Sequence, residues 1–139
     1  MPITKAELQK LADERLAEAE ALFAAGRHSG AYYLAGYAAE LALKAIIAST
    51  FKADQIPDKK RVDAIFTHEL DKLANQAGLR GALEARSQAS RAFEGNWTIA
   101  SGWSEAARYQ VWTQADAFAF LRALADPEEG VMPWLKTFW

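Results

Sequence analysis

Five polar side chains recur at helical spacing in an otherwise apolar stretch, and they are the strongest chemical pattern in the chain. Their separations are four, four, three and four positions, for Ser29, Tyr33, Tyr37, Glu40 and Lys44. Residues at these intervals share one face of a helix. Because burying polar groups without partners is costly, that face needs water, a partner chain or internal hydrogen bonds. The pattern predicts either an internal Glu40–Lys44 ion pair with packed tyrosines, or a ligand groove or dimer cleft.

A histidine and an arginine in the next polar segment form a second candidate site. Arg61 and His68 are seven positions apart, which is nearly two helical turns, so a continuous helix would place both on one side. An arginine can hold a phosphate with two hydrogen bonds, and a histidine can transfer a proton near neutral pH. The pair would suit metal-independent cleavage of RNA by its own 2′-hydroxyl. The alternative is that His68 only packs or begins a helix.

Composition excludes several other chemistries. The chain has no cysteine and two histidines, His28 and His68, so thiol catalysis and thiolate metal sites are excluded and no metal is expected. The sequence contains no glycine-rich phosphate loop and no Ser/His/Asp arrangement, and no cofactor is expected. The net charge of −2 indicates that the protein does not bind nucleic acid over its whole surface, but it is compatible with a local basic patch.

The elements that position these residues are expected to be helices. Alanine, leucine and charged residues are abundant in the 139-residue chain while valine and isoleucine are scarce, which favours helix over sheet. Apolar spacing and cap residues predict helices at about 4–25, 29–50, 58–78 (with a break allowed near Thr67), 79–94 and 113–125. Residues 95–111 are predicted to be irregular, and a short segment is expected to follow residue 126.

These elements predict an all-α, up-and-down helical bundle of about five helices in a single domain, residues 1–139. Its core is expected at about 4–125, followed by an aromatic C-terminal segment at 126–139. Between residues 30 and 48 the charged side chains are Glu40 and Lys44, which is typical of the central helix of a bundle and argues against a membrane span. The N-terminal residues lack the apolar core of a signal peptide, so a cytoplasmic location is expected.

Aromatic side chains are concentrated in the last third of the chain. All five tryptophans lie there: Trp97, Trp103, Trp112, Trp134 and Trp139. Such rings can stack on bases, but few lysines or arginines surround them. Core packing or a subunit interface is therefore the favoured interpretation of these rings. One possibility for the protein as a whole is a helical bundle whose aromatic C-terminal segment serves only to form an oligomer.

Three segments taken together resemble the HEPN domain family. Residues 25–27 (AGR) with residues 31–45 (AYYLAGYAAELALKA) are similar to the second-helix signature of the family. Residues 67–73 (THELDKL) resemble its segment of a histidine followed by leucines, and residues 103–109 (WSEAARY) resemble its later Arg-Tyr segment. The order and spacing agree with the family over roughly residues 8–125.

The resemblance implies a helical bundle that usually dimerises, with a polar cleft between protomers. Some family members are metal-independent ribonucleases, often toxins, that use an arginine followed after about four to six residues by a histidine. Others lack this motif and are non-catalytic partners of minimal nucleotidyltransferases with a proposed nucleotide- or RNA-binding role. Downstream of Arg108 the histidine is absent, because positions 113–115 are Thr, Gln and Ala. The resemblance therefore favours the non-catalytic branch.

The resulting hypothesis is a homodimeric nucleotide- or RNA-binding protein that acts with a nucleotidyltransferase-type partner in a toxin–antitoxin or defence-like system. The residues expected at its cleft are Tyr33, Tyr37, Glu40, Lys44, Arg108 and Tyr109. Arginine and lysine would meet phosphate, tyrosine would stack or hydrogen-bond, and Glu40 would orient the basic groups. The alternative is a metal-independent endoribonuclease in which His68 handles protons and Arg61 or Arg108 stabilises charge on the reacting phosphate.

Overall fold

A computed structural model describes residues 2–139, and these residues form eight α-helices and one 3-10 helix with no strand. The elements in chain order are α1 (Lys5–Ala24), α2 (His28–Ala48), α3 (Lys59–Ile65), α4 (Leu70–Gln76), α5 (Arg80–Ala89), α6 (Arg91–Ser101), η1 (Glu105–Tyr109), α7 (Gln114–Ala125) and α8 (Val131–Lys136). The predicted all-α class is confirmed. The predicted count of about five helices is wrong, because two of the expected helices are each divided in two and the last segment forms one of its own.

Local signals set the ends of α1 and α2 as expected. The Thr4 hydroxyl accepts a hydrogen bond from the amide of Glu7 at 3.2 Å, and the Glu7 carboxylate accepts one from the amide of Thr4 at 2.7 Å. This reciprocal pair satisfies two backbone donors at the start of α1. At the other end Gly26 has a φ of +78°, which an L side chain rarely adopts, and the chain turns there into α2.

The helix predicted at 58–78 is interrupted between Ile65 and Leu70, which gives α3 and α4. The helix predicted at 79–94 ends early, because Ser90 is extended (φ −143°, ψ 115°) and its hydroxyl caps α6 by accepting from the amide of Phe93 at 3.1 Å. Residues 95–101, predicted to be irregular, are therefore helical. Phe93 and Trp97 are one turn apart and both buried, and this apolar contact holds α6 on the core despite the glycine between them.

The C-terminal segment packs on its own chain. Val131, Met132 and Leu135 of α8 are buried in the same core as α2. The Glu129 carboxylate just before α8 accepts hydrogen bonds from Arg86 and Ser90, each at 2.7 Å, and so ties this turn to the α5–α6 junction. The five tryptophans are either part of the core or packed against it, as the core-packing interpretation predicted.

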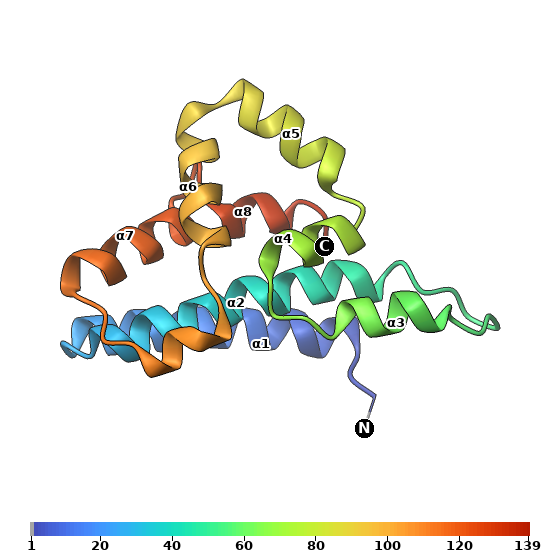
Figure 1. Cartoon of the computed structure of the whole chain (residues 1–139), viewed down its shortest axis with the longest axis horizontal. Coiled ribbons are helices and arrows are strands. Elements are labelled where there is room, and N and C mark those ends of the chain that lie inside the picture. The colour runs from blue at the N-terminus through green and yellow to red at the C-terminus, as the bar shows by residue number, and fades with distance from the viewer. Residues whose placement is uncertain (1) are drawn as a thin grey trace.

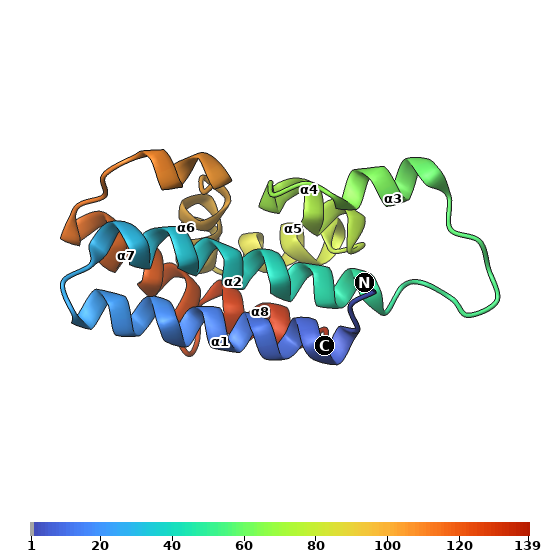
Figure 2. The ribbon, with the colours of Figure 1, turned by 90° about the horizontal axis from the view of Figure 1, so that it is seen from below.

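Helices α1 and α2 form an antiparallel pair along the long axis of the molecule (Figure 1), and the shorter helices are arranged around α2. Figure 2 shows α3, α4 and the segment preceding α7 on the side of α2 opposite α1. The up-and-down order applies to the first two helices, whereas α6 stands across the direction of α2 in Figure 1. Within residues 2–139, none of the helices has the length and apolar character that crossing a membrane requires.

Candidate functional site

The centre of the candidate site is Glu40, the one charged side chain buried among the described residues, with 4% of its surface exposed. It projects from the middle of α2. One carboxylate oxygen lies 2.6 Å from Nδ1 of His68, and the other lies 3.5 Å from Nζ of Lys44. A buried carboxylate is tolerated when it has such partners, because they replace the hydration that it loses. The predicted Glu40–Lys44 pair is therefore present, with His68 as an additional partner.

His68 joins Glu40 to a second carboxylate on a distant element. The ring lies in the link between α3 and α4, and its Nε2 is 3.1 Å from Oε2 of Glu105 on η1. A carboxylate accepts but cannot donate, so Nδ1 carries a hydrogen that it donates to Glu40. Nε2 can donate to Glu105 when the ring holds both protons. We call Glu40, Lys44, His68 and Glu105 the Glu40 cluster.

Two tyrosines extend the polar face of α2 from the Glu40 cluster toward its N-terminus. The Tyr33 hydroxyl donates to the Tyr37 hydroxyl at 3.2 Å, and the Tyr37 ring meets the His68 ring edge-on with centroids 6.1 Å apart. Burial raises the pKa of Tyr37, and its hydrogen bond with Tyr33 raises that pKa further. Both rings are half-buried and lie beside the Trp103 indole.

Arg108 and Tyr109 at the end of η1 supply the exposed part of the site. The guanidinium of Arg108 is fully exposed, and the nearby hydroxyls of Tyr33 and Tyr109 raise its pKa. Its central carbon lies 4.8 Å from the centroid of the Tyr109 ring, and Tyr109 is 78% exposed. Among the described residues no carboxylate forms an ion pair with Arg108. We call Tyr33, Arg108 and Tyr109 the Arg108 surface.

The structure thus brings together six of the residues singled out from the sequence: Tyr33, Tyr37, Glu40, Lys44, Arg108 and Tyr109. Ser29, the first residue of the predicted polar face, has a different role, since its hydroxyl accepts from the amide of Trp112 at 2.9 Å. Glu105 was not predicted. Its partner lies 37 positions earlier in the chain, and no periodicity or short motif connects residues so far apart.

The expectation that Arg61 and His68 share one side of a continuous helix is wrong. Helix α3 ends at Ile65, and the chain changes direction before α4 begins. Arg61 instead donates to the hydroxyl of Thr50 and to the carbonyl of Gln76, and it lies over the ring of Phe51 at 4.8 Å. It therefore fastens the segment after α2 to the core, while His68 contacts Glu40 and Glu105.

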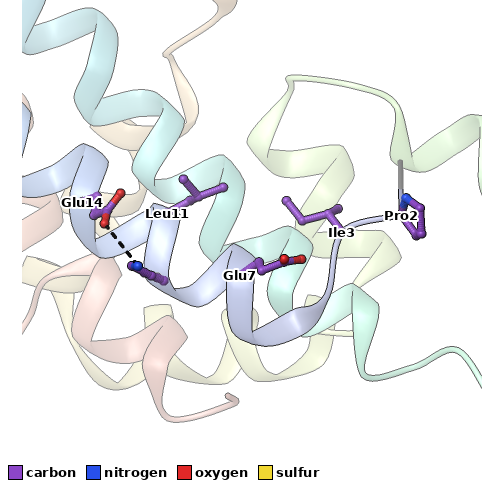
Figure 3. A pocket seen from close by; sticks show the side chains of 6 residues that line it. Pro2, Ile3, Glu7, Leu11 and Glu14 are labelled. Atoms are coloured by element: carbon purple, nitrogen blue, oxygen red, sulfur yellow. Dashed lines mark ion pairs between the residues drawn. The ribbon is translucent and has the colours of Figure 1, made fainter.

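The main surface cavities lie apart from the Arg108 surface. One of about 600 Å³ is mostly apolar and is lined by Ile3, Thr4, Lys5, Leu8, Leu41, Lys44, Ile47, Ala48, Phe51, Ile65 and Phe66. Another, of about 380 Å³, lies along the outer side of α1 with Ile3, Leu11 and Glu14 on its walls (Figure 3). In the part of the chain that the structure describes, no group of three or more histidines and carboxylates is disposed to hold a metal ion.

A sequence model of the HEPN domain matches residues 6–111, which is more than half of the chain. The matched range contains both α1 and α2, the Glu40 cluster and the Arg108 surface. Comparison with curated proteins and with solved structures gives no match.

The aromatic support of the site depends on one glycine. Trp103 is 2% exposed and lies directly on Gly36 of α2, where a Cβ atom would come within 1.9 Å of the indole. The indole also meets the Tyr37 ring edge-on, with centroids 5.1 Å apart. Trp103 immediately precedes the segment that carries Arg108. A side chain at position 36 would therefore displace both the tyrosine and η1.

We expect Gly36→Ala to destabilise the protein by about 1–3 kcal/mol, because the added methyl group overpacks the contact with Trp103. Thermal and urea denaturation measure this change, and near-UV circular dichroism reports the displaced indole. Gly81→Ala is the matched control, because a Cβ there meets nothing within 4 Å and φ is not positive. Alanine at position 81 should be neutral or stabilising by up to about 1 kcal/mol. Equal stability of the two variants would contradict the proposed contact.

Proposed function

The chain belongs to the HEPN domain family, and on this premise we propose that it is a nucleotide- or RNA-binding protein. The observation that carries the proposal is the Arg108 surface, where an exposed guanidinium that pairs with no carboxylate of residues 2–139 lies near the Tyr33 hydroxyl and the exposed Tyr109 ring. A guanidinium in this position can hold a phosphate through two hydrogen bonds. The neighbouring ring offers a face on which a base can stack.

The Glu40 cluster supports this surface from inside. Glu40 is held by Lys44 and His68, so its charge is balanced locally and does not need Arg108. Arg108 therefore stays available to an anion from solution. The tyrosine pair connects the two regions, because the Tyr33 hydroxyl donates to Tyr37 and also raises the pKa of the nearby Arg108. In this proposal Glu40 orients Lys44 and His68, and Arg108 at the exposed end receives the ligand. This differs from the sequence hypothesis, in which Glu40 orients both Arg108 and Lys44 toward phosphate.

The first test removes the guanidinium. We expect Arg108→Ala to weaken binding of a fluorescently labelled single-stranded RNA by roughly 10- to 100-fold, the loss of a charge-assisted hydrogen-bonded contact. Fluorescence anisotropy at fixed salt measures the affinity. Arg122→Ala is the matched control, because it removes the same charge from an exposed position on α7 outside the site.

Competition with unlabelled mononucleotide separates the two forms of ligand. If the mononucleotide displaces the labelled RNA at a concentration similar to that of unlabelled RNA, the ligand is a nucleotide. If only unlabelled RNA displaces it, the ligand is RNA. If Arg108→Ala and Arg122→Ala bind as tightly as each other, the Arg108 surface is not the binding site.

The proposal includes a homodimer and a nucleotidyltransferase-type protein partner in a toxin–antitoxin or defence-like system. The partner and the system rest on the family alone. The dimer has additional support, because Tyr109 and Val111 expose large apolar surfaces next to Arg108. Apolar residues in such a position are typical of subunit contacts.

We expect Val111→Lys to convert a dimer to a monomer, because the charge would be buried without a partner in the interface. Light scattering coupled to size-exclusion chromatography gives the mass in solution. Ile56→Lys is the control, since Ile56 is 98% and Val111 93% exposed, and Ile56 lies in the link between α2 and α3 rather than next to η1. A monomeric wild type, or an Ile56→Lys monomer with dimeric Val111→Lys, would contradict this surface.

A metal-independent endoribonuclease is the second candidate, and the 2.6 Å contact between Glu40 and His68 favours it. A carboxylate that orients an imidazole is a common feature of histidines that transfer protons. Two observations place it second. Nε2, the nitrogen that would serve the substrate, faces Glu105. In addition, no histidine follows Arg108 in the rest of the chain.

We expect no RNA cleavage by the wild-type protein in the presence of a chelator, measured with an end-labelled single-stranded RNA on a denaturing gel. His68→Gln is the diagnostic variant, since it can keep a hydrogen bond to Glu40 but cannot transfer a proton. Removing a proton-transferring group typically lowers a rate by about 10²–10⁴-fold. Chelator-resistant cleavage that His68→Gln abolishes would make the enzyme the correct assignment.

A further inference from the structure

One imidazole ring connects three elements that are far apart in the chain. His68 lies in the link between α3 and α4, its Nδ1 is 2.6 Å from Glu40 of α2, and its Nε2 is 3.1 Å from Glu105 of η1. The Glu40 end is anchored, because that carboxylate is buried and also pairs with Lys44. The Glu105 end is about half exposed and can separate from the ring without exposing any core.

The element held at the Glu105 end is short. η1 has five residues, Glu105–Tyr109, and no side chain caps its first turn. One side of it is fixed through Ala107, which is buried and whose carbonyl accepts from the Trp112 indole at 3.1 Å. The contact of Glu105 with His68 fixes a second side. Together with Trp103, which packs on Gly36 just before η1, these two attachments set the orientation of the helix and the positions of Arg108 and Tyr109.

We propose that His68 is a positioning residue of the binding surface, which holds η1 against α2 through Glu105 and thereby places Arg108 and Tyr109 for the ligand. The effect on ligand binding rests on the proposed function. The effect on η1 does not, and it can be measured without any ligand.

This attachment depends on the second ring proton. Nδ1 keeps its hydrogen for Glu40, so the neutral ring presents a bare nitrogen to Glu105, and two acceptors then face each other. The doubly protonated ring donates from Nε2 and pairs with the carboxylate. Raising the pH until the ring gives up this second proton should therefore release Glu105.

The other charged and titratable groups around the ring belong to the elements packed against it. They are Glu40, Lys44 and Tyr37 of α2, Glu105 of η1, and the exposed Glu69–Lys72 pair at the start of α4. Lysine and tyrosine ordinarily titrate at higher pH than histidine, and carboxylates at lower pH. Because the ring of His68 is the group that donates to Glu105, a pH-dependent release of η1 is assigned to this ring.

Glu105→Gln separates this attachment from other effects of pH. The amide can accept from the protonated ring and can donate to the bare nitrogen of the neutral ring, so the contact no longer depends on the second proton. Glu69→Gln is the matched control. It removes the same charge next to His68 in the sequence, from a side chain that pairs with Lys72 and not with the ring.

The experiment measures amide hydrogen exchange of residues 104–110 at about pH 6 and about pH 8, corrected for the intrinsic exchange rates. In the wild type and in Glu69→Gln, protection of these amides should fall about two- to fivefold at the higher pH, as expected for the loss of a partly exposed ion pair. In Glu105→Gln it should stay constant. Equal pH dependence in the wild type and Glu105→Gln would overturn the proposal.

The RNA affinity of the same proteins gives the second measurement. The wild type should lose affinity between the two pH values by about two- to fivefold more than Glu105→Gln does. If protection of η1 behaves as expected and none of the proteins binds RNA or nucleotide, the proposed function fails while the attachment by His68 stands. If the RNA affinity falls equally with pH in the wild type and in Glu105→Gln, although η1 is released only in the wild type, the role of His68 in positioning the surface is overturned.

Discussion

The carboxylate of Glu40 is the constraint on which the organisation of the site depends. Its place in the middle of α2 removes it from water, and a charge so buried needs partners within hydrogen-bonding distance. Lys44 is one turn away on the same helix and provides one partner. The other is His68, which must be delivered from outside α2. The link between α3 and α4 therefore has to approach α2 at this level. A continuous helix through the link would not present the ring in the same way.

The composition of α2 allows this arrangement. Half of its buried positions are alanine, which lets neighbouring helices approach closely, and Gly36 lets the Trp103 indole lie directly on the backbone. The indole then supports Tyr37, which in turn contacts the His68 ring. Aromatic packing and the buried ion pairs thus reinforce each other. Because each contact brings another residue to α2, the helix acts as the common support for elements from both halves of the chain.

Polar groups along this face differ in how available they are to a ligand. At the inner end Glu40 is buried and is paired with Lys44 and His68, which are partly exposed. At the outer end Arg108 is fully exposed, next to Tyr33 and Tyr109. The contacts at the inner end stabilise the fold, whereas the exposed guanidinium at the outer end is available to bind an anion. The histidine nitrogen that RNA cleavage would use faces Glu105, and for this reason we propose phosphate binding ahead of cleavage.

Features of the fold that depend on neighbours in sequence were predictable from the sequence alone. The all-helical class, the cap at Thr4, the turn at Gly26 and the polar face of α2 follow from backbone hydrogen bonding, side-chain volume and helical period. The resemblance that identified the family also lies in such local segments, and the family match supports it.

Tertiary structure decided the rest. Ser90, where α5 ends, donates from its hydroxyl to Glu129, which is 39 positions later in the chain. Glu105 contacts His68, which is 37 positions earlier. Arg61 donates to Thr50 and Gln76, because the helix that was expected to align it with His68 is interrupted. The physical reason is the range of the interactions. Helical propensity and capping act over one or two turns, whereas the partners of a buried charge are chosen among groups that only the folded chain brings within reach.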